Sequence, residues 1–71
     1  RRKGRAMNWD MIKGQWKQLK GSAQSKWGEI TDDELERAEG DRERMIGLVQ
    51  EKYGMAREEA ERQVDEWGRG L

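Results

Sequence analysis

Apolar side chains recur at steps of three and four along the first third of the chain, and this spacing predicts an amphipathic helix. At about 100° per residue they fall on one face; the positions are Trp9, Ile12, Trp16, Leu19, Ala23 and Trp27. Asn8 precedes them as an N-cap, because its side-chain oxygen can accept from free amides of the first turn. We expect a helix from about Trp9 toward Trp27, which Gly21 and Ser22 could bend or end early.

A helix end followed by a helix start is predicted around Gly28. This glycine can adopt the left-handed conformation that closes a helix. Thr31 and Glu34 have the spacing of a capping box, in which each side chain satisfies a backbone amide of the other. Ile30 and Leu35 flank the cap and are placed to pack across it. We therefore predict that a second helix begins just after Thr31.

Two more helices are predicted in the second half of the chain. Apolar residues keep helical spacing through Gly40, so the second helix and a third one over 41–53 either form one rod or bend there. Gly54 is placed to close the third helix. The fourth helix runs to about Trp67, and its start is weakly capped because Ala56 stands where Ser or Thr is expected.

The two halves of the chain are similar to each other. Glycines recur with the same spacing in both halves, at an offset of 26 residues; the two sets are Gly14, Gly21 and Gly28, then Gly40, Gly47 and Gly54. Each half has the pattern of a longer helix, a glycine turn and a helix with acidic residues in its first turn. We predict an all-α, four-helix domain over residues 7–71, built of two packed α-hairpins with approximate internal duplication.

Composition makes this domain small and strongly hydrophilic. The chain has 71 residues, 42% of them charged, with nine glycines and a mean hydropathy of −1.33. The absence of proline and the periodic apolar positions argue against disorder, so we expect a folded helical domain of low stability. No apolar run approaches the roughly 20 residues that cross a membrane. These features predict a cytoplasmic protein that does not enter the membrane.

Charge is distributed unevenly although the net charge is zero. Residues 1–28 carry eight Lys and Arg and one acid, whereas residues 29–71 carry seven Lys and Arg and fourteen acids. Part of the positive charge lies in residues 1–6, which we interpret as a flexible basic extension, either native or an addition to the natural chain. The opposite charges of the two halves make self-association between copies one hypothesis for a partner; nucleic acid is another, which we do not favour.

One basic stripe on the first predicted helix is a candidate binding site. We name it the lysine face; it consists of Lys13, Lys17 and Lys20. Positions i, i+4 and i+7 share one helix face, so three ammonium groups could follow the phosphates of a nucleic acid or bind another anion. The alternative is an ordinary solvated face. The tryptophans could stack on bases, but their phase with aliphatic residues favours a place in the core.

The sequence offers little for catalysis. It has no histidine and no cysteine, which removes the commonest general base and the commonest zinc ligands. Carboxylates are plentiful, but all lie on faces predicted to be exposed, whereas acid–base work requires a desolvated or well-partnered group. No glycine-rich phosphate loop and no calcium-loop pattern occurs. We therefore predict a protein that is not an enzyme and that uses no cofactor or metal.

Several linked motifs resemble the CsbD-like family of small bacterial stress-response proteins. They are Met-Asn-Trp-Asp, Ile-Lys-Gly-Gln-Trp-Lys-Gln-Leu-Lys-Gly, Lys-Trp-Gly-Glu-Ile-Thr-Asp-Asp-Glu-Leu and Gln-Glu-Lys-Tyr-Gly, and the resemblance covers Met7 to Trp67. It implies four helices in two crossed hairpins, induction under general stress and no established molecular activity. It transfers no catalytic or binding residue. Ala56 departs from the Ser or Thr usual in this family.

The resemblance implies a small, hydrophilic, non-enzymatic protein of the general stress response. The alternative interpretation is a weak anion-binding or nucleic-acid-binding module that uses the lysine face.

Overall fold

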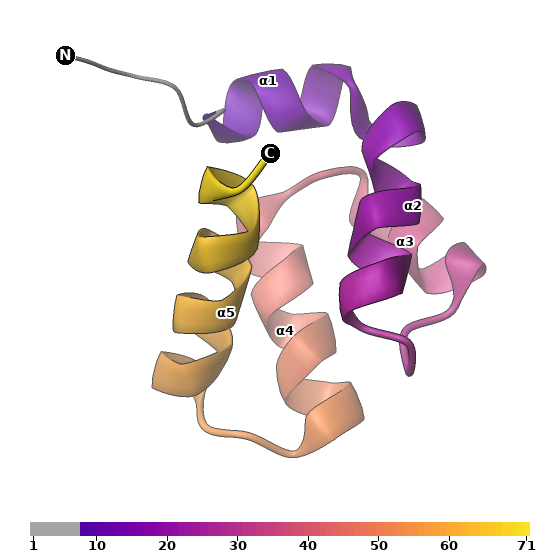
Figure 1. Cartoon of the computed structure of the whole chain (residues 1–71). Helices are drawn as coiled ribbons and strands as arrows, with labels where there is room; N and C mark the ends of the chain where they lie inside the picture. Colours follow the sequence, from indigo (N-terminus) through magenta and orange to yellow (C-terminus); the bar gives the residue numbers. More distant parts are fainter. Residues whose placement is uncertain (1–7) are drawn as a thin grey trace, which may run out of the picture.

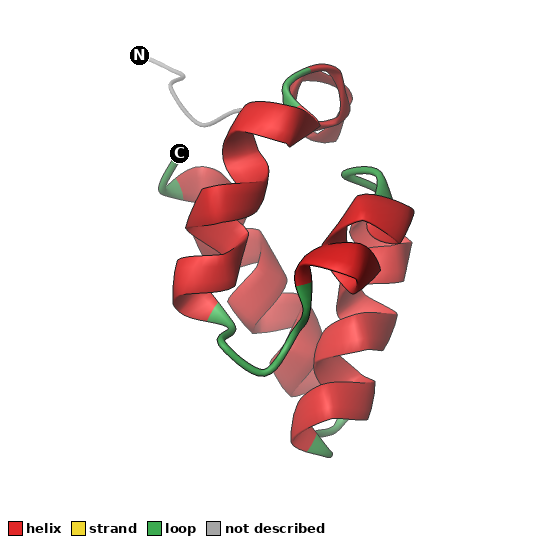
Figure 2. Cartoon of the chain, turned by 90° about the vertical axis from the view of Figure 1, so that its right-hand side faces the viewer, coloured by secondary structure: helices red, strands yellow, loops and turns green. Residues whose placement is uncertain are grey.

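The computed structural model describes residues 8–71, and the basic extension predicted over residues 1–6 lies outside this range. The described part of the chain contains five α-helices and no strand (Figure 2). In chain order they are α1 Trp9–Gly14, α2 Trp16–Lys26, α3 Asp32–Ala38, α4 Arg42–Tyr53 and α5 Arg57–Arg69. The predicted all-α class is therefore confirmed for residues 8–71.

The helix predicted from Trp9 toward Trp27 is interrupted, so five helices replace the predicted four. The break falls at Gln15, whose φ of −115° and ψ of 21° are not helical. The predicted weak point at Gly21 lies inside α2. The interruption lets α1 turn across the end of the molecule and pack beside the last turn of α5 (Figure 1), where a Cβ at Gly68 would lie 3.6 Å from the Trp9 ring. The predicted two-hairpin duplication stays a prediction.

The chain bends sharply between α3 and α4, which settles the question that periodicity left open. Glu39 and Gly40 both have positive φ, 57° and 75° respectively. At Gly40 the turn also touches the backbone of α1, because a Cβ there would lie 2.9 Å from the Cα of Lys13. Asp41 then caps α4 by accepting a hydrogen bond of 3.0 Å from the amide of Arg44. This turn therefore holds three helices together.

Four of the five predicted helix-end features are present. The Asn8 side chain accepts a hydrogen bond of 2.9 Å from the Met11 amide, and no side chain caps α5 at Ala56. The capping box of α3 forms, since the Thr31 amide donates to Glu34 Oε1 at 3.0 Å and the Glu34 amide donates to Thr31 Oγ at 3.2 Å. Gly54 closes α4 with a φ of 63°. The left-handed conformation predicted for Gly28 is wrong. The chain leaves α2 through Trp27, whose φ of −121° and ψ of 80° are not helical and whose indole is anchored in the core, so no left-handed residue is required there.

The core draws apolar side chains from all five helices. Among residues 8–71 no polar or charged residue is buried; the buried hydrophobic residues are Ile12, Trp16, Ala23, Trp27, Ile30, Leu35, Ala38, Met45, Ile46, Val49, Ala60, Val64 and Trp67. Trp9 and Leu19 are partly buried against this set. The prediction that the tryptophans form core rather than a base-stacking surface agrees with these positions.

Trp67 is the centre of the aromatic part of the core. Its ring centroid lies 6.0 Å from that of Trp9, 6.0 Å from that of Trp16 and 5.6 Å from that of Trp27. Its indole N–H donates to Ser22 Oγ at 3.1 Å. Because these rings come from α1, α2 and α5 and from the turn after α2, one contact cluster joins both ends of the described chain.

Candidate functional site

The lysine face predicted for anion binding is divided by the helix break. Lys13 lies in the last turn of α1 and is exposed, and Lys17 is exposed on α2. Lys20 is different, because its side chain is only 14% exposed and its ammonium lies 3.0 Å from Glu36 and 3.4 Å from Asp32 on α3. The hydrogen bond to Glu36 is the main reason why the pKa of Lys20 is raised.

This arrangement reduces the positive charge available for an external anion. Two acidic groups of α3 already compensate Lys20, so the exposed cations of the lysine face are Lys13 and Lys17. The sequence could not show this, because Lys20 and its partners are twelve and sixteen residues apart. The packing of α2 against α3 brings them together.

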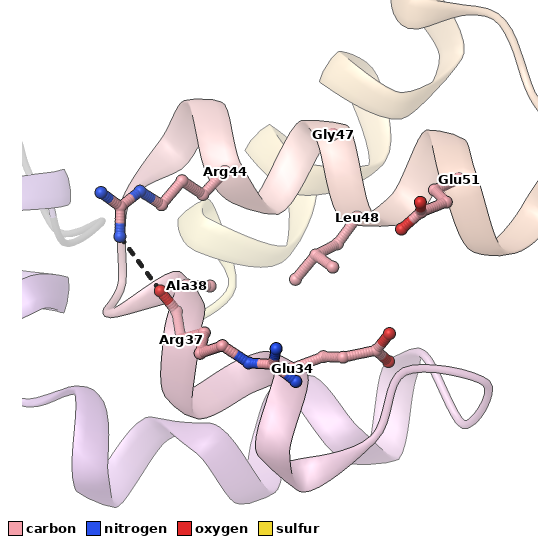
Figure 3. A pocket seen from close by; sticks show the side chains of 7 residues that line it. All are labelled: Glu34, Arg37, Ala38, Arg44, Gly47, Leu48 and Glu51. Carbon is pink, nitrogen blue, oxygen red and sulfur yellow. Dashed lines mark hydrogen bonds between the residues drawn. The ribbon is translucent and has the colours of Figure 1, made fainter.

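A groove lies between α3 and α4, and sequence reasoning missed it. Its volume is about 320 Å³ (Figure 3); its lining residues are Glu34, Arg37, Ala38, Arg44, Gly47, Leu48 and Glu51. Leu48 is half-buried, and a Cβ at Gly47 would meet no atom within 4 Å. The one sequence feature that pointed to this groove was the pair Gly47–Leu48. Here an apolar residue extends the apolar face of the helix toward the face that carries Gly47.

Charge is segregated along this groove. On the α4 wall, the end near the α3–α4 turn carries Arg44, whereas on the α3 wall the Arg37 side chain extends toward Glu34 (Figure 3). The opposite end carries Glu51 and Glu34. Lys52 lies 2.6 Å from the Glu34 carboxylate and lowers the pKa of that carboxyl to about 2, with help from the Thr31 amide.

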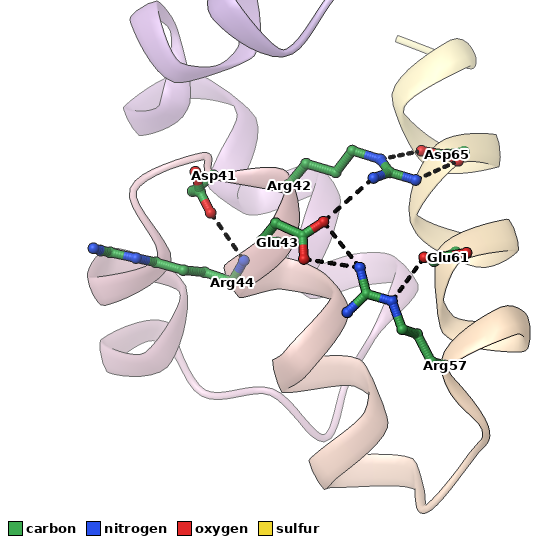
Figure 4. A network of polar contacts seen from close by, with 7 residues as sticks. All are labelled: Asp41, Arg42, Glu43, Arg44, Arg57, Glu61 and Asp65. Atoms are coloured by element: carbon green, nitrogen blue, oxygen red, sulfur yellow. Dashed lines mark hydrogen bonds and ion pairs between the residues drawn. The ribbon is translucent and has the colours of Figure 1, made fainter.

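The other face of α4 is joined to α5 by a chain of ion pairs (Figure 4). Arg42 makes a bidentate contact with Asp65, with N–O distances of 2.8 and 3.0 Å. Arg57 bridges Glu43 at 2.8 Å and Glu61 at 2.8 Å. The Arg42 guanidinium lowers the pKa of Asp65. These side chains are one-third to two-thirds exposed, so each pair contributes modest stability.

Three of the four hydroxyl groups have structural partners. Ser22 accepts from Trp67, Thr31 belongs to the capping box, and Tyr53 accepts a hydrogen bond of 3.1 Å from the Glu29 amide. Residues 8–71 contain no group of three or more acidic side chains placed to hold a metal ion. None of the helices in this range is both long enough and apolar enough to span a bilayer.

Comparison with known proteins gives a consistent result. A family model described as CsbD-like matches residues 10–62. A UPF0337 protein of Bordetella pertussis is 56% identical over 61 residues, which is 86% of this chain and 92% of the relative. A UPF0337 protein of Pseudomonas aeruginosa is 50% identical over 58 residues, 82% of this chain and 89% of the relative. The UPF0337 protein YjbJ of Escherichia coli is 44% identical over 61 residues, 86% of this chain and 88% of the relative.

Proposed function

The chain belongs to the CsbD-like family, and from this premise we propose that it is a non-enzymatic protein of the general stress response that works through its hydrated, charged surface. We place it in the cytoplasm. Its action on other macromolecules would be protective or accessory, with no bond made or broken.

One observation carries this proposal, namely the separation of apolar and charged groups. Every buried side chain among residues 8–71 is apolar, and the charged groups of this range remain in contact with water. A catalytic acid, base or nucleophile needs partial desolvation or a neighbour that activates it. The described polar groups instead make ion pairs, caps and hydrogen bonds between helices. The surface is therefore the part of the molecule that can act.

Such a surface has a physical role when water is lost or solutes accumulate. Carboxylates, ammonium and guanidinium groups of both signs can replace water as hydrogen-bonding partners of neighbouring macromolecules. The closed apolar core keeps Trp16, Trp27 and Trp67 away from those neighbours, so the protein itself offers them little apolar contact area. The fold, and not composition alone, keeps the two kinds of group apart.

A protection assay tests this role. A dehydration-sensitive enzyme is dried and rehydrated with the full chain, with Trp16→Ala or with Trp16→Phe at equal mass. We expect protection from the full chain and from Trp16→Phe, and clearly less from Trp16→Ala, which exposes its core. The same three versions are then expressed in a deletion strain under drying or osmotic stress, where survival should follow the same order. Equal protection by Trp16→Ala would assign the effect to composition and refute a role for the folded surface.

Anion or nucleic-acid binding through the lysine face remains a second proposal. The exposure of Lys13 and Lys17 supports it, and the ion pairs of Lys20 with α3 weaken it. Phosphate contacts contribute additively to affinity, so a face of two free cations binds weakly at physiological salt.

A further inference from the structure

We propose that the groove between α3 and α4 is a self-association surface, on which a second copy of this chain lays its own α4 in antiparallel orientation across a two-fold axis. This interface uses one short patch of each copy. It differs from pairing between the basic and acidic halves of the chain.

The register of charge on α4 supports this interface. Arg44 and Glu51 both line the groove and are seven residues apart, about 10.5 Å along the helix axis. The point midway between them falls between Gly47 and Leu48. If two copies of α4 cross there in antiparallel orientation, Arg44 of each copy lies opposite Glu51 of the other. A two-fold interface requires a surface that is complementary to itself, and this one satisfies that requirement.

The shape of the surface at this crossing point also favours the interface. A Cβ at Gly47 would meet nothing within 4 Å, so the backbone of α4 is open to close approach there. Leu48 is half-buried beside it, and Ala38 forms part of the opposite wall. A flat glycine next to an aliphatic side chain allows two helices to pack closely and to bury apolar area at the centre. The charges then lie at the rim, as in most protein interfaces.

The charged groups of the groove are available to a partner. Glu51 is exposed and makes no ion pair within residues 8–71. Arg44 pairs with Glu39 at 3.0 Å and donates to the Arg37 carbonyl at 3.1 Å, but its side chain is 60% exposed, so these contacts are weak and easily exchanged. Arg37 adds a cation on the opposite wall, on α3, and the one described hydrogen bond of its side chain runs to the Asp33 carbonyl at 3.5 Å.

These features favour a second copy over other occupants. A nucleic acid would meet the carboxylates of Glu34 and Glu51, and an acidic peptide would meet them too. A basic peptide would meet Arg37 and Arg44. A ligand fits if it carries a negative charge opposite Arg44 and a positive charge opposite Glu51. An antiparallel α4 from a second copy presents its charges in this order. Because the groove is small, the interface lies at the low end of the size range, and we expect association in the micromolar range or weaker.

A charge exchange tests the register. Sedimentation equilibrium of the full chain, from about 10 μM to about 1 mM, should show a reversible dimer that weakens with added salt. Arg44→Glu alone and Glu51→Arg alone should each raise the dissociation constant about tenfold, because both symmetric pairs become repulsive. The double variant should return it to within about threefold of the original, because the pairs re-form with opposite sign. A monomer throughout, or a double variant no better than the singles, would overturn the proposal.

Cysteine cross-linking tests the crossing point. The chain has no native cysteine, so Gly47→Cys introduces one thiol close to the two-fold axis. Gly21→Cys is the matched control, since this glycine also lies inside a helix, is exposed and has nothing within 4 Å of a Cβ. Under mild oxidation Gly47→Cys should form disulfide-linked dimers at least about ten times faster than Gly21→Cys. Equal rates would place the contact elsewhere and refute the interface, even if the protein dimerises.

Discussion

Gly40→Ala should be one of the most damaging small substitutions in this protein, although it adds a single methyl group. Gly40 occupies the turn between α3 and α4 with a φ of 75°. An alanine Cβ there would lie 2.9 Å from the Cα and 3.2 Å from the amide nitrogen of Lys13. Both neighbours are backbone atoms of α1, so no side-chain rotation relieves the overlap, and α1 itself has to move.

The expected loss of stability follows from three contributions. The left-handed conformation costs an alanine about 1–2 kcal/mol. Displacing a packed helix costs about 1–3 kcal/mol, by analogy with overpacked cores. Alanine also restricts the unfolded chain, which returns about 0.4–1 kcal/mol. The net destabilisation is about 1–4.5 kcal/mol, a large share of the total for a domain of this size. The melting temperature should therefore fall by about 5–35 °C.

Thermal unfolding followed by tryptophan fluorescence measures this loss, and Gly14→Ala is the matched control. Gly14 is the counterpart of Gly40 at the 26-residue offset, but it lies exposed in α1 with nothing within 4 Å of a Cβ. Alanine at Gly14 should raise stability by about 0.4–1 kcal/mol. The two substitutions thus have opposite signs. A neutral or stabilising Gly40→Ala would mean that α1 does not rest on the α3–α4 turn.

Three further predictions concern the core, the pH dependence and the lysine face. Trp16→Ala should lower the free energy of unfolding by about 3–5 kcal/mol and largely unfold the protein. Trp16→Phe should lower it by about 1–3 kcal/mol, because the Leu35 carbonyl loses its 2.7 Å hydrogen bond from the indole N–H. Urea melts measure both losses. The ionised Glu34 carboxylate, whose pKa is lowered to about 2, stabilises the fold fully above pH about 4.5, and this contribution is lost as the pH falls toward about 2. The melting temperature of Glu34→Gln should therefore fall less steeply with pH in this window than that of the wild type or of Glu58→Gln. Residues 7–71 should show no measurable nucleic-acid binding at about 150 mM salt. Micromolar binding would contradict this prediction if Lys→Gln substitutions on the lysine face also weaken the dependence of the affinity on salt concentration.

Local rules predicted the features that depend on neighbours in sequence. The capping box at Thr31 and the positive φ of Gly54 involve groups a few residues apart, and both are present. The helical phase of Ile12, Trp16 and Ala23 also placed them correctly in the core, because a period of 3.6 residues fixes which side chains share a face.

The features that sequence did not predict depend on contacts between distant elements. Gln15 is a good helix former within an unbroken apolar stripe, so nothing local marks it as the point where α1 ends. The break at Gln15 lets α1 pack against α5 and against the turn at Gly40. The same applies to Lys20, whose charge is compensated by α3, and to the groove at Leu48, whose two walls come from α3 and α4. Packing decides these features, and periodicity carries no information about it.

The cluster around Trp67 also has an optical consequence. Indole rings with centroids 5.6 to 6.0 Å apart exchange excitation, and their coupled transitions produce paired circular dichroism bands of opposite sign. These bands overlap the helical signal in the far ultraviolet. An ellipticity read in this region therefore reports ring geometry together with helix content. Replacing Trp9 by phenylalanine would change the spectrum without unwinding any helix. A helical fraction calculated from the far-ultraviolet ellipticity would then be wrong even for a fully folded sample.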